Sequence, residues 1–147
     1  MILSNLRQNG REKLTAISKA TSIPVSTIFD KIRNYEENDV IKRHSCLLNF
    51  NKLGYDIDVL ILLKTEKEEK ERLREFLDEQ DCLNSIFKLS NSYDFLIEAV
   101  FTDMQDLQDF VDDLEERFKL IRNDVLHITS DLKREDFLKN LLGGKND

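Results

Sequence analysis

The sequence has 147 residues, of which 40% are hydrophobic and 35% are charged, and its formal net charge at pH 7 is -7. This balance excludes a disordered chain, and the length allows one ordinary domain or two small ones. The longest apolar run, residues 59–63, is far shorter than the roughly 20 residues of a membrane-spanning helix, and the chain does not open like a secretory signal. We therefore expect a cytoplasmic protein with no membrane partner.

Charge is distributed unevenly along the chain. Residues 1–45 hold eight Lys or Arg against five Asp or Glu, a net of +3, whereas the remainder holds 14 against 24, a net of -10. A polyanion-binding head on an acidic body would show this asymmetry, and so would a chance imbalance in a charge-rich protein. The charge pattern therefore allows a nucleic-acid partner without establishing one.

The first third of the chain predicts a helix-turn-helix with a wing. An apolar series before the turn signal at residues 9–10 indicates a first short helix, and a second series at helical spacing covers residues 14–21. Pro24 suits the first turn of a third helix, because its φ is fixed and its missing N–H has no intrahelical partner there. Apolar residues around Lys42 and Arg43 then indicate a short β-wing, for which a solvated hairpin is the plain alternative.

The third predicted helix has one apolar stripe and one polar face. Ile28, Ile32 and Tyr35 recur at intervals of four and three residues, so they share a buried side. The other side carries hydroxyls, an aromatic ring and charges, which suit contacts in the major groove of DNA. These candidates are Ser26, Thr27, Phe29, Asp30, Lys31 and Arg33. Lys42 and Arg43 are candidates for flanking phosphates, and a solvated surface is the alternative for each residue taken singly.

Beyond residue 55 the apolar pattern changes from helical to strand period, which predicts a second domain. Strands are expected over residues 56–65, 82–90, 94–101 and 125–132, with helices over 66–79 and 103–118. This β-α-β-β-α-β order is the ferredoxin-like arrangement, so the expected fold class is α+β. The expected parts are a winged helix-turn-helix domain over residues 1–50, a hinge over 51–55, a ferredoxin-like domain over 56–133, and a C-terminal helix and tail over 134–147.

The predicted sheet has apolar residues on both faces. Alternate residues of its first strand face the helices, yet Leu60 and Leu62 on the opposite side are apolar too. A sheet with one solvated face would carry polar residues there. We therefore expect a second subunit to cover it. The competing explanation is a swapped or intramolecular cover, such as a C-terminal helix that carries Phe137, Leu138, Leu141 and Leu142.

The sequence shows no pattern typical of catalysis or of a metal site. Cys46 and Cys82 lack the spacing of metal ligands and fall at predicted strand positions, so we expect small buried thiols. His44 lies among cations and His127 alternates with apolar residues, so neither has an evident acid or nucleophile as partner. We therefore expect no enzyme, no metal and no bound cofactor.

Five segments resemble a known family in their residues and in their order. They are LT-x-ISK at 14–19, IPVSTIFDKI at 23–32, EENDVIK at 36–42, KLGY at 52–55 and SYD at 92–94. The sequence resembles the Lrp/AsnC family of feast/famine transcription regulators over nearly its whole length. The resemblance implies a sequence-specific regulator that binds double-stranded DNA at a pseudo-palindromic site as a homodimer joined sheet to sheet, and that often assembles as four dimers.

The resemblance also implies an amino-acid effector. The RAM-type domain of this family commonly binds one near a turn that here comprises Asn91, Ser92, Tyr93 and Asp94, which are therefore the candidate effector residues. Asn91 replaces the usual glycine and tolerates positive φ. Ser92 replaces the usual acid, which removes a partner for a ligand's ammonium group. Ser22 likewise stands where the family usually has glycine.

Two other functions remain open from the sequence. Some chains that resemble this family are sirohaem decarboxylases, in which the two halves enclose a tetrapyrrole. A ligand-sensing or protein-binding module that no longer binds DNA is favoured by the short first helix, by Asp30 and by the acidic body. The exposed face of the third helix makes a transcription regulator the expected function.

Overall fold

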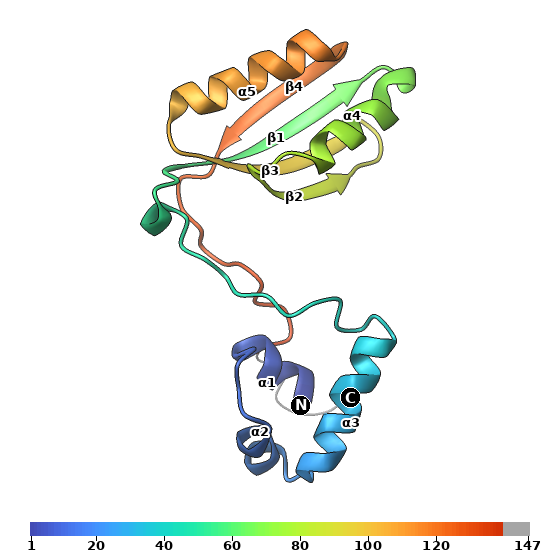
Figure 1. Ribbon diagram of the computed structural model, residues 1–147, viewed down its shortest axis with the longest axis vertical. Coiled ribbons are helices and arrows are strands. Elements are labelled where there is room, and N and C mark those ends of the chain that lie inside the picture. Colours follow the sequence, from blue (N-terminus) through green and yellow to red (C-terminus); the bar gives the residue numbers. More distant parts are fainter. Residues whose placement is uncertain (140–147) are drawn as a thin grey trace. The chain divides into compact units, whose positions relative to one another are not determined.

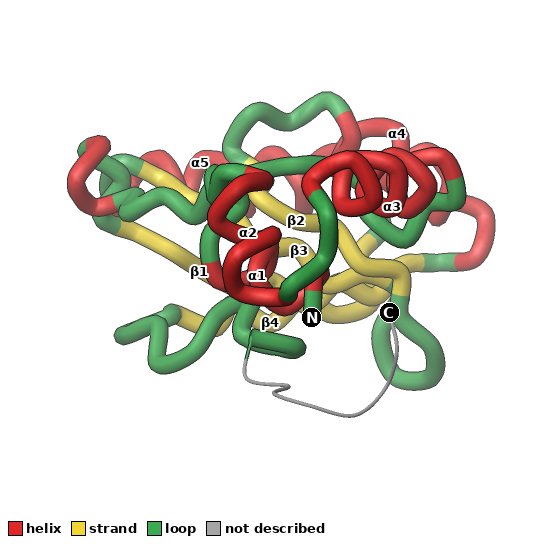
Figure 2. The backbone as a smooth tube through the Cα atoms, turned by 90° about the horizontal axis from the view of Figure 1, so that it is seen from below, coloured by secondary structure: helices red, strands yellow, loops and turns green. Residues whose placement is uncertain are grey.

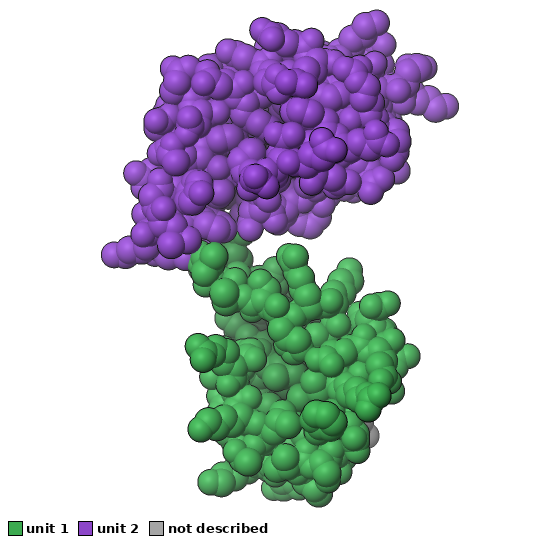
Figure 3. All heavy atoms as spheres, in the orientation of Figure 1, with its two compact units in different colours: residues 1–48, 132–147 green, residues 49–131 purple. Residues whose placement is uncertain are grey.

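The computed structural model describes residues 1–139, which fall into two compact units (Figure 3). Unit 1 comprises residues 1–48 together with residues 132–139, and unit 2 comprises residues 49–131. Among these described residues, no helix is both long enough and apolar enough to cross a membrane.

Unit 1 contains the three predicted helices, α1 (Ile2–Gln8), α2 (Leu14–Thr21) and α3 (Val25–Glu37) (Figure 1). Each contributes one isoleucine to a small core, and Ile2, Ile17 and Ile28 are almost fully buried. Around them pack Leu6, Leu14, Ile23, Ile32 and Tyr35. The predicted stripe on α3 is therefore confirmed.

The turn between α2 and α3 is closed by Ser22 in the left-handed region, with φ 59 and ψ 22. Its N–H donates to the carbonyl of Ser18 at 2.8 Å. Thr21 Oγ1 donates to the carbonyl of Ile17 at 2.8 Å and accepts from the N–H of Ile23 at 3.4 Å. These bonds hold a conformation that favours glycine, which allows serine to stand there.

The predicted β-wing is not formed, because residues 41–49 have no strand pairing. The N–H of Ile41 instead donates to the carbonyl of Tyr35 at 3.0 Å, and His44 Nε2 lies 2.8 Å from Glu36 Oε1. Both contacts return to the last turns of α3. The chain therefore leaves this helix as an extended segment rather than as a hairpin.

The prediction that Cys46 is buried is also wrong. Its thiol is exposed, and the neighbouring Leu47 and Leu48 are 60% and 56% exposed. These apolar residues suggested a paired strand, but within one protomer nothing described covers them. Cys82 is half-buried, and burial raises the pKa of its thiol.

Unit 2 has a four-stranded antiparallel sheet in the order β2-β3-β1-β4. The strands are β1 (Ile57–Thr65), β2 (Leu83–Lys88), β3 (Phe95–Phe101) and β4 (Leu120–His127). Helices α4 (Lys70–Asp78) and α5 (Met104–Arg117) lie on the same side of this sheet (Figure 2). The predicted α+β class and ferredoxin-like order are therefore confirmed.

Two short 3-10 helices complete unit 2. The first, η1 (Asn51–Leu53), lies in the predicted hinge and is followed by Gly54 at φ 89, a value that favours glycine. The second, η2 (Lys67–Glu69), forms the first turn of the helix that was predicted to begin at residue 66. Thus η2 leads directly into α4, whereas residues 54–56 separate η1 from β1.

The last strand was misplaced by five residues, since β4 covers residues 120–127 rather than 125–132. Its pairing with β1 sets Val125 opposite Ile61 and Asp124 opposite Leu62. Residues 122–124 are polar, so the apolar pattern that predicted the strand did not begin until residue 125. The sheet accepts them because alternate residues of β4 face away from the helices.

The core of unit 2 lies between the sheet and its two helices. Val59, Ile61 and Leu63 of β1 are fully buried, and α4 and α5 cover them with leucines and aromatic rings. The opposite face of β1 carries Leu60 and Leu62, which are only half-buried. The prediction of two apolar faces is therefore confirmed.

Replacing Ile28 by Ala is expected to lower the free energy of unfolding of unit 1 by about 2–5 kcal/mol, because it leaves a cavity in a small core. Urea denaturation followed by circular dichroism measures the change. Val25→Ala on the same helix is the control, since Val25 is exposed and its loss is expected to cost about 0.5 kcal/mol or less. An equal effect of both substitutions would contradict the three-isoleucine core.

Candidate nucleic-acid interface

The predicted DNA-contacting residues of α3 lie on its solvent-facing side. Ser26, Thr27 and Asp30 are exposed, and Phe29 is 56% exposed although it is a large apolar side chain. This exposure follows from the helical period, because Ile28 on the opposite side of α3 is buried in the core. Four residues therefore form a continuous surface over the first two turns.

The first turn of α3 has main-chain donors without a side-chain cap. Pro24 is the N-cap residue, with φ -57 and ψ 143, and no side chain of the described residues caps this helix. The first turn contains no acidic residue. Unsatisfied N–H groups and the positive end of the helix dipole favour an anion at this position, and a DNA phosphate is such an anion.

The two cations of α3 differ in their surroundings. Arg33 pairs along its own helix, where its Nε lies 2.8 Å from Glu37 Oε1 one turn later. Both partners are exposed, so this pair contributes little to stability and Arg33 remains able to exchange Glu37 for a phosphate. Lys31 is half-buried, which sets its stem against the helix surface.

Lys42 and Arg43 lie on the extended segment that follows α3. Both are exposed, as a phosphate contact requires. They do not belong to a β-hairpin, so their position depends on the short connection to the end of α3. The next residue, His44, pairs with Glu36 near the end of α3. The other histidine, His127, lies at the end of β4 in unit 2.

The predicted effector turn lies between β2 and β3. Asn91 has φ 74, the left-handed conformation for which asparagine was expected to replace glycine. The Tyr93 hydroxyl donates to the carboxylate of Asp124 on β4, and this bond raises the pKa of Tyr93 and lowers the pKa of Asp124. Arg122 lies 5.1 Å from the centre of the Tyr93 ring and 2.9 Å from the Asp124 carboxylate.

Asp94 is turned inward and is not a free ligand for an effector. Its carboxylate is 2.6 Å from Lys70 Nζ and 3.3 Å from Lys64 Nζ, and it accepts from the N–H of Thr65 at 3.0 Å. Burial works to raise the pKa of Asp94, but the hydrogen bonds from Lys70, Thr65 and Lys64 outweigh it and lower the pKa. Asp94 therefore joins β3 to the end of β1 and to the start of α4.

The sequence is similar to proteins named as HTH-type transcriptional regulators. No family model matches the sequence. The HTH-type transcriptional regulator FL11 of Pyrococcus furiosus is 27% identical over 111 residues, which cover 76% of this chain and 74% of FL11. An uncharacterised HTH-type transcriptional regulator of the same organism is 24% identical over 136 residues, 92% of this chain and 91% of that protein.

Solved structures match over nearly the whole chain. LrpC of Bacillus subtilis superposes with a TM-score of 0.81 at 12% identity, covering 90% of this chain and 92% of LrpC. AsnC of Escherichia coli gives a TM-score of 0.78 at 16% identity, with coverage of 90% and 91%. The chain has the Lrp/AsnC fold. The predicted resemblance to this family is confirmed.

The Lrp/AsnC fold places two charged residues that the sequence did not suggest. Arg122 and Asp124 lie beside the effector turn because β4 begins at residue 120. Arg122 and Asp124 are two positions apart, so they fall on the same side of a strand, and this spacing could have indicated a strand with a polar side. The prediction missed it because the predicted strand began at residue 125.

A cleft of about 680 Å³ lies at the same end of the sheet, between the start of α4, the end of α5 and the start of β4. Several polar side chains that line it are paired within the fold. Arg72 binds Glu69 at 2.6 Å and the carbonyl of Arg117 at 2.7 Å, and Asn123 donates to Glu115 at 2.7 Å. Among the described residues, no group of three His, Cys, Asp or Glu is placed to hold a metal ion.

Replacing Asp94 by Asn is expected to lower the free energy of unfolding by about 1–3 kcal/mol at pH 7, because the ionised carboxylate bonds two ammonium groups. The folded pKa of Asp94 is lowered, so its contribution is full above the unfolded value of about 3.9 and is lost as pH falls through the folded value.

Urea denaturation at pH 7 and near pH 3 measures this effect. The difference between the two proteins is expected to shrink at the lower pH. Asp78→Asn is the control, because Asp78 is exposed and its pair with exposed Arg74 at 3.3 Å contributes little to stability. A loss that is the same at both pH values would show that the Asp94 carboxylate does not act through its charge.

Proposed function

We propose that this protein is a sequence-specific DNA-binding transcription regulator that acts as a dimer. The observation that carries the proposal is the N-terminal half of α3, where hydroxyls and an aromatic ring are exposed beside uncapped main-chain N–H groups. The relatives named as HTH-type transcriptional regulators, matched over 74% to 92% of their length, support it.

In this proposal α3 enters the major groove by its first two turns. Ser26 and Thr27 bond phosphates or base edges, and Phe29 packs on a thymine methyl group. Arg33 bonds phosphate or guanine. Asp30 accepts from cytosine N4 and disfavours other bases at that position, because a carboxylate near phosphates is otherwise costly.

Affinity would come mainly from phosphate contacts by Lys31, Arg33, Lys42 and Arg43. Replacing Arg43 by Ala is expected to weaken binding to all duplexes alike and to reduce the slope of log K against log salt by about one unit. Fluorescence anisotropy across a salt series measures the slope. Arg74→Ala in unit 2 is the matched control, and an unchanged slope for the Arg43 variant would remove Arg43 from the contacts.

The open face of the sheet supports a dimer. It carries Leu60 and Leu62 of β1, and on the two edge strands Phe87 of β2 and Leu126 of β4 are 52% and 50% exposed. An apolar sheet surface of this kind favours pairing with the same surface of a second copy. Two DNA-binding units related by a two-fold axis would then require a pseudo-palindromic site, with half-sites about 34 Å apart or a multiple of it.

Replacing Leu126 by Glu is expected to convert the dimer to a monomer at micromolar concentration, because two copies of a carboxylate would be buried in the contact. Sedimentation velocity measures the change. Met104→Glu is the control, since Met104 is 53% exposed on α5 at the other side of the sheet. An Leu126 variant that sediments as the dimer would place the contact elsewhere.

We also propose an amino-acid effector at residues 91–94. A transcriptional regulator of Neisseria meningitidis solved in complex with L-Met superposes with a TM-score of 0.82 at 20% identity, covering 90% of this chain and 88% of that protein. Because Asp94 is engaged inside the fold, contacts with the ligand would come from Asn91, Ser92 and Tyr93. Assembly of four dimers belongs to the same proposal.

Selection of random duplexes followed by sequencing tests the function directly. The protein is expected to enrich one motif with two-fold symmetry, and a variant with both Ser26 and Thr27 replaced by Ala is expected to lose that enrichment. Absence of any enriched motif at low salt would favour the alternative of a DNA-independent ligand-sensing or interaction module.

A further inference from the structure

The DNA-binding unit is built from two separate parts of the chain. After β4 ends at His127, the chain returns to unit 1, and residues 132–139 belong to that unit together with residues 1–48. We call residues 132–139 the return segment. Its described part has turns and bends where a C-terminal helix was predicted, and residues 140–147 of that prediction lie outside the described residues. Phe137 and Leu138 of the predicted cover for the sheet belong to unit 1, and Leu141 and Leu142 lie outside the described residues.

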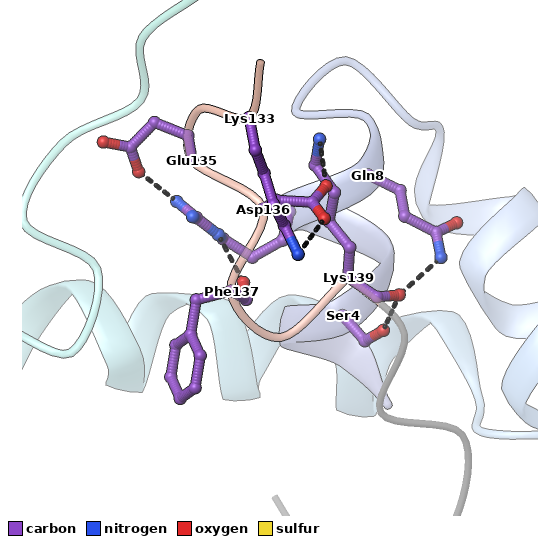
Figure 4. A network of polar contacts seen from close by, with 8 residues as sticks. Ser4, Gln8, Lys133, Glu135, Asp136, Phe137 and Lys139 are labelled. Carbon is purple, nitrogen blue, oxygen red and sulfur yellow. Dashed lines mark hydrogen bonds and ion pairs between the residues drawn. The ribbon is translucent and has the colours of Figure 1, made fainter.

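Three side chains of α1 hold the return segment by its main chain (Figure 4). Ser4 Oγ and Gln8 Nε2 both donate to the carbonyl of Lys139, at 3.0 and 2.7 Å. Arg7 Nε donates to the carbonyl of Phe137 at 3.1 Å. The spacing of three and four residues places these donors on one face of the helix. This face of α1 therefore contacts the return segment.

One ion pair joins α1 to the return segment, and two further ion pairs lie within the segment (Figure 4). Arg7 Nη1 lies 2.9 Å from Glu135 Oε2. Within the return segment, Asp136 is bonded by Lys133 at 3.1 Å and by Lys139 at 3.0 Å, and the hydrogen bonds from Lys139 and Lys133 lower the pKa of Asp136. The segment therefore has its own closed turn, which presents its carbonyls to α1.

The backbone of the return segment is strained at two positions. Glu135 has φ 51 and Leu138 has φ 71, so both non-glycine residues lie in the left-handed region. Such conformations are costly and persist where surrounding contacts hold them. The contacts with Ser4, Arg7 and Gln8, together with the Asp136 ion pairs inside the segment, hold these conformations.

The helix α1 in turn needs external support. It has seven residues, fewer than an isolated helix needs to be stable in water. It nevertheless supplies Ile2, which is 1% exposed and belongs to the same buried cluster as Ile17 and Ile28 of α3. Displacement of α1 would therefore withdraw one of the three buried isoleucines from the core that supports α3.

We propose that the return segment is a structural part of the DNA-binding unit. It fixes α1, and through the buried cluster that Ile2 shares with Ile17 and Ile28 it fixes α3 for binding. Arg7 is a positioning residue, since it joins Glu135 and the Phe137 carbonyl to the helix. The effect on DNA binding rests on the proposed function, whereas the effect on α1 does not.

Two truncated proteins test the proposal. One ends after Asp131 and lacks the return segment, and its matched control ends after Asn140 and keeps it. Hydrogen exchange followed by mass spectrometry is expected to show amides of α1 exchanging about tenfold faster in the shorter protein, with β1–β4 unchanged. Equal exchange of α1 in the two proteins would overturn the proposal.

DNA affinity is measured on the same pair with the duplex selected by the full chain. The shorter protein is expected to bind about tenfold more weakly, because three hydrogen bonds that support α1 are lost. Equal affinity combined with faster exchange of α1 would overturn the link to α3. If the full chain binds no duplex, the proposed function fails, and the exchange measurement still decides the role of the return segment.

Replacing Glu135 by Gln separates support of α1 from simple charge. This change removes a negative charge from the DNA-binding unit, so phosphate attraction alone would strengthen binding. The proposal instead expects faster exchange in α1 by about two- to fivefold and weaker binding, because the pair with Arg7 is lost. Glu12→Gln in the same unit is the control, and stronger binding by the Glu135 variant with unchanged exchange would contradict the proposal.

Discussion

Burial of three isoleucines, one from each of α1, α2 and α3, is the interaction on which unit 1 depends. A core this small gives unit 1 a low free energy of unfolding, because few apolar groups offset the entropy of ordering the chain. Its geometry decides which side of α3 is exposed, since Ile28 fixes the rotation of the helix. The residues proposed to contact DNA are thus placed by a contact on the opposite side of the same helix.

The same dependence explains why both ends of unit 1 matter. Ile2 belongs to a helix of two turns, and that helix is held by the return segment through Ser4, Arg7 and Gln8.

In unit 2 the two faces of the sheet differ. One face packs against α4 and α5, and the other carries leucines that favour pairing with a second copy. Asp94, bonded by two lysines, ties the turn beside that face to the body of the fold.

Local periodicity predicted most elements correctly, since helical spacing of Ile28, Ile32 and Tyr35 and the alternation along β1 report directly on burial. It failed where a strand was polar and where apolar residues were exposed. Residues 122–124 hid the start of β4, and Leu47 and Leu48 suggested a wing that does not form. In both cases long-range pairing, and not local pattern, decides whether a strand exists.

The amino-acid sequence by itself determined the α+β class, the order of the elements, the exposed residues of α3 and the positive φ of Asn91, because each follows from spacing or from backbone sterics. Only the tertiary structure decided that Asp94 is an internal anchor, that Tyr93 bonds Asp124, and that residues 132–139 fold against α1. Those contacts join residues about 30 to 135 positions apart, and no local periodicity encodes which distant partners meet.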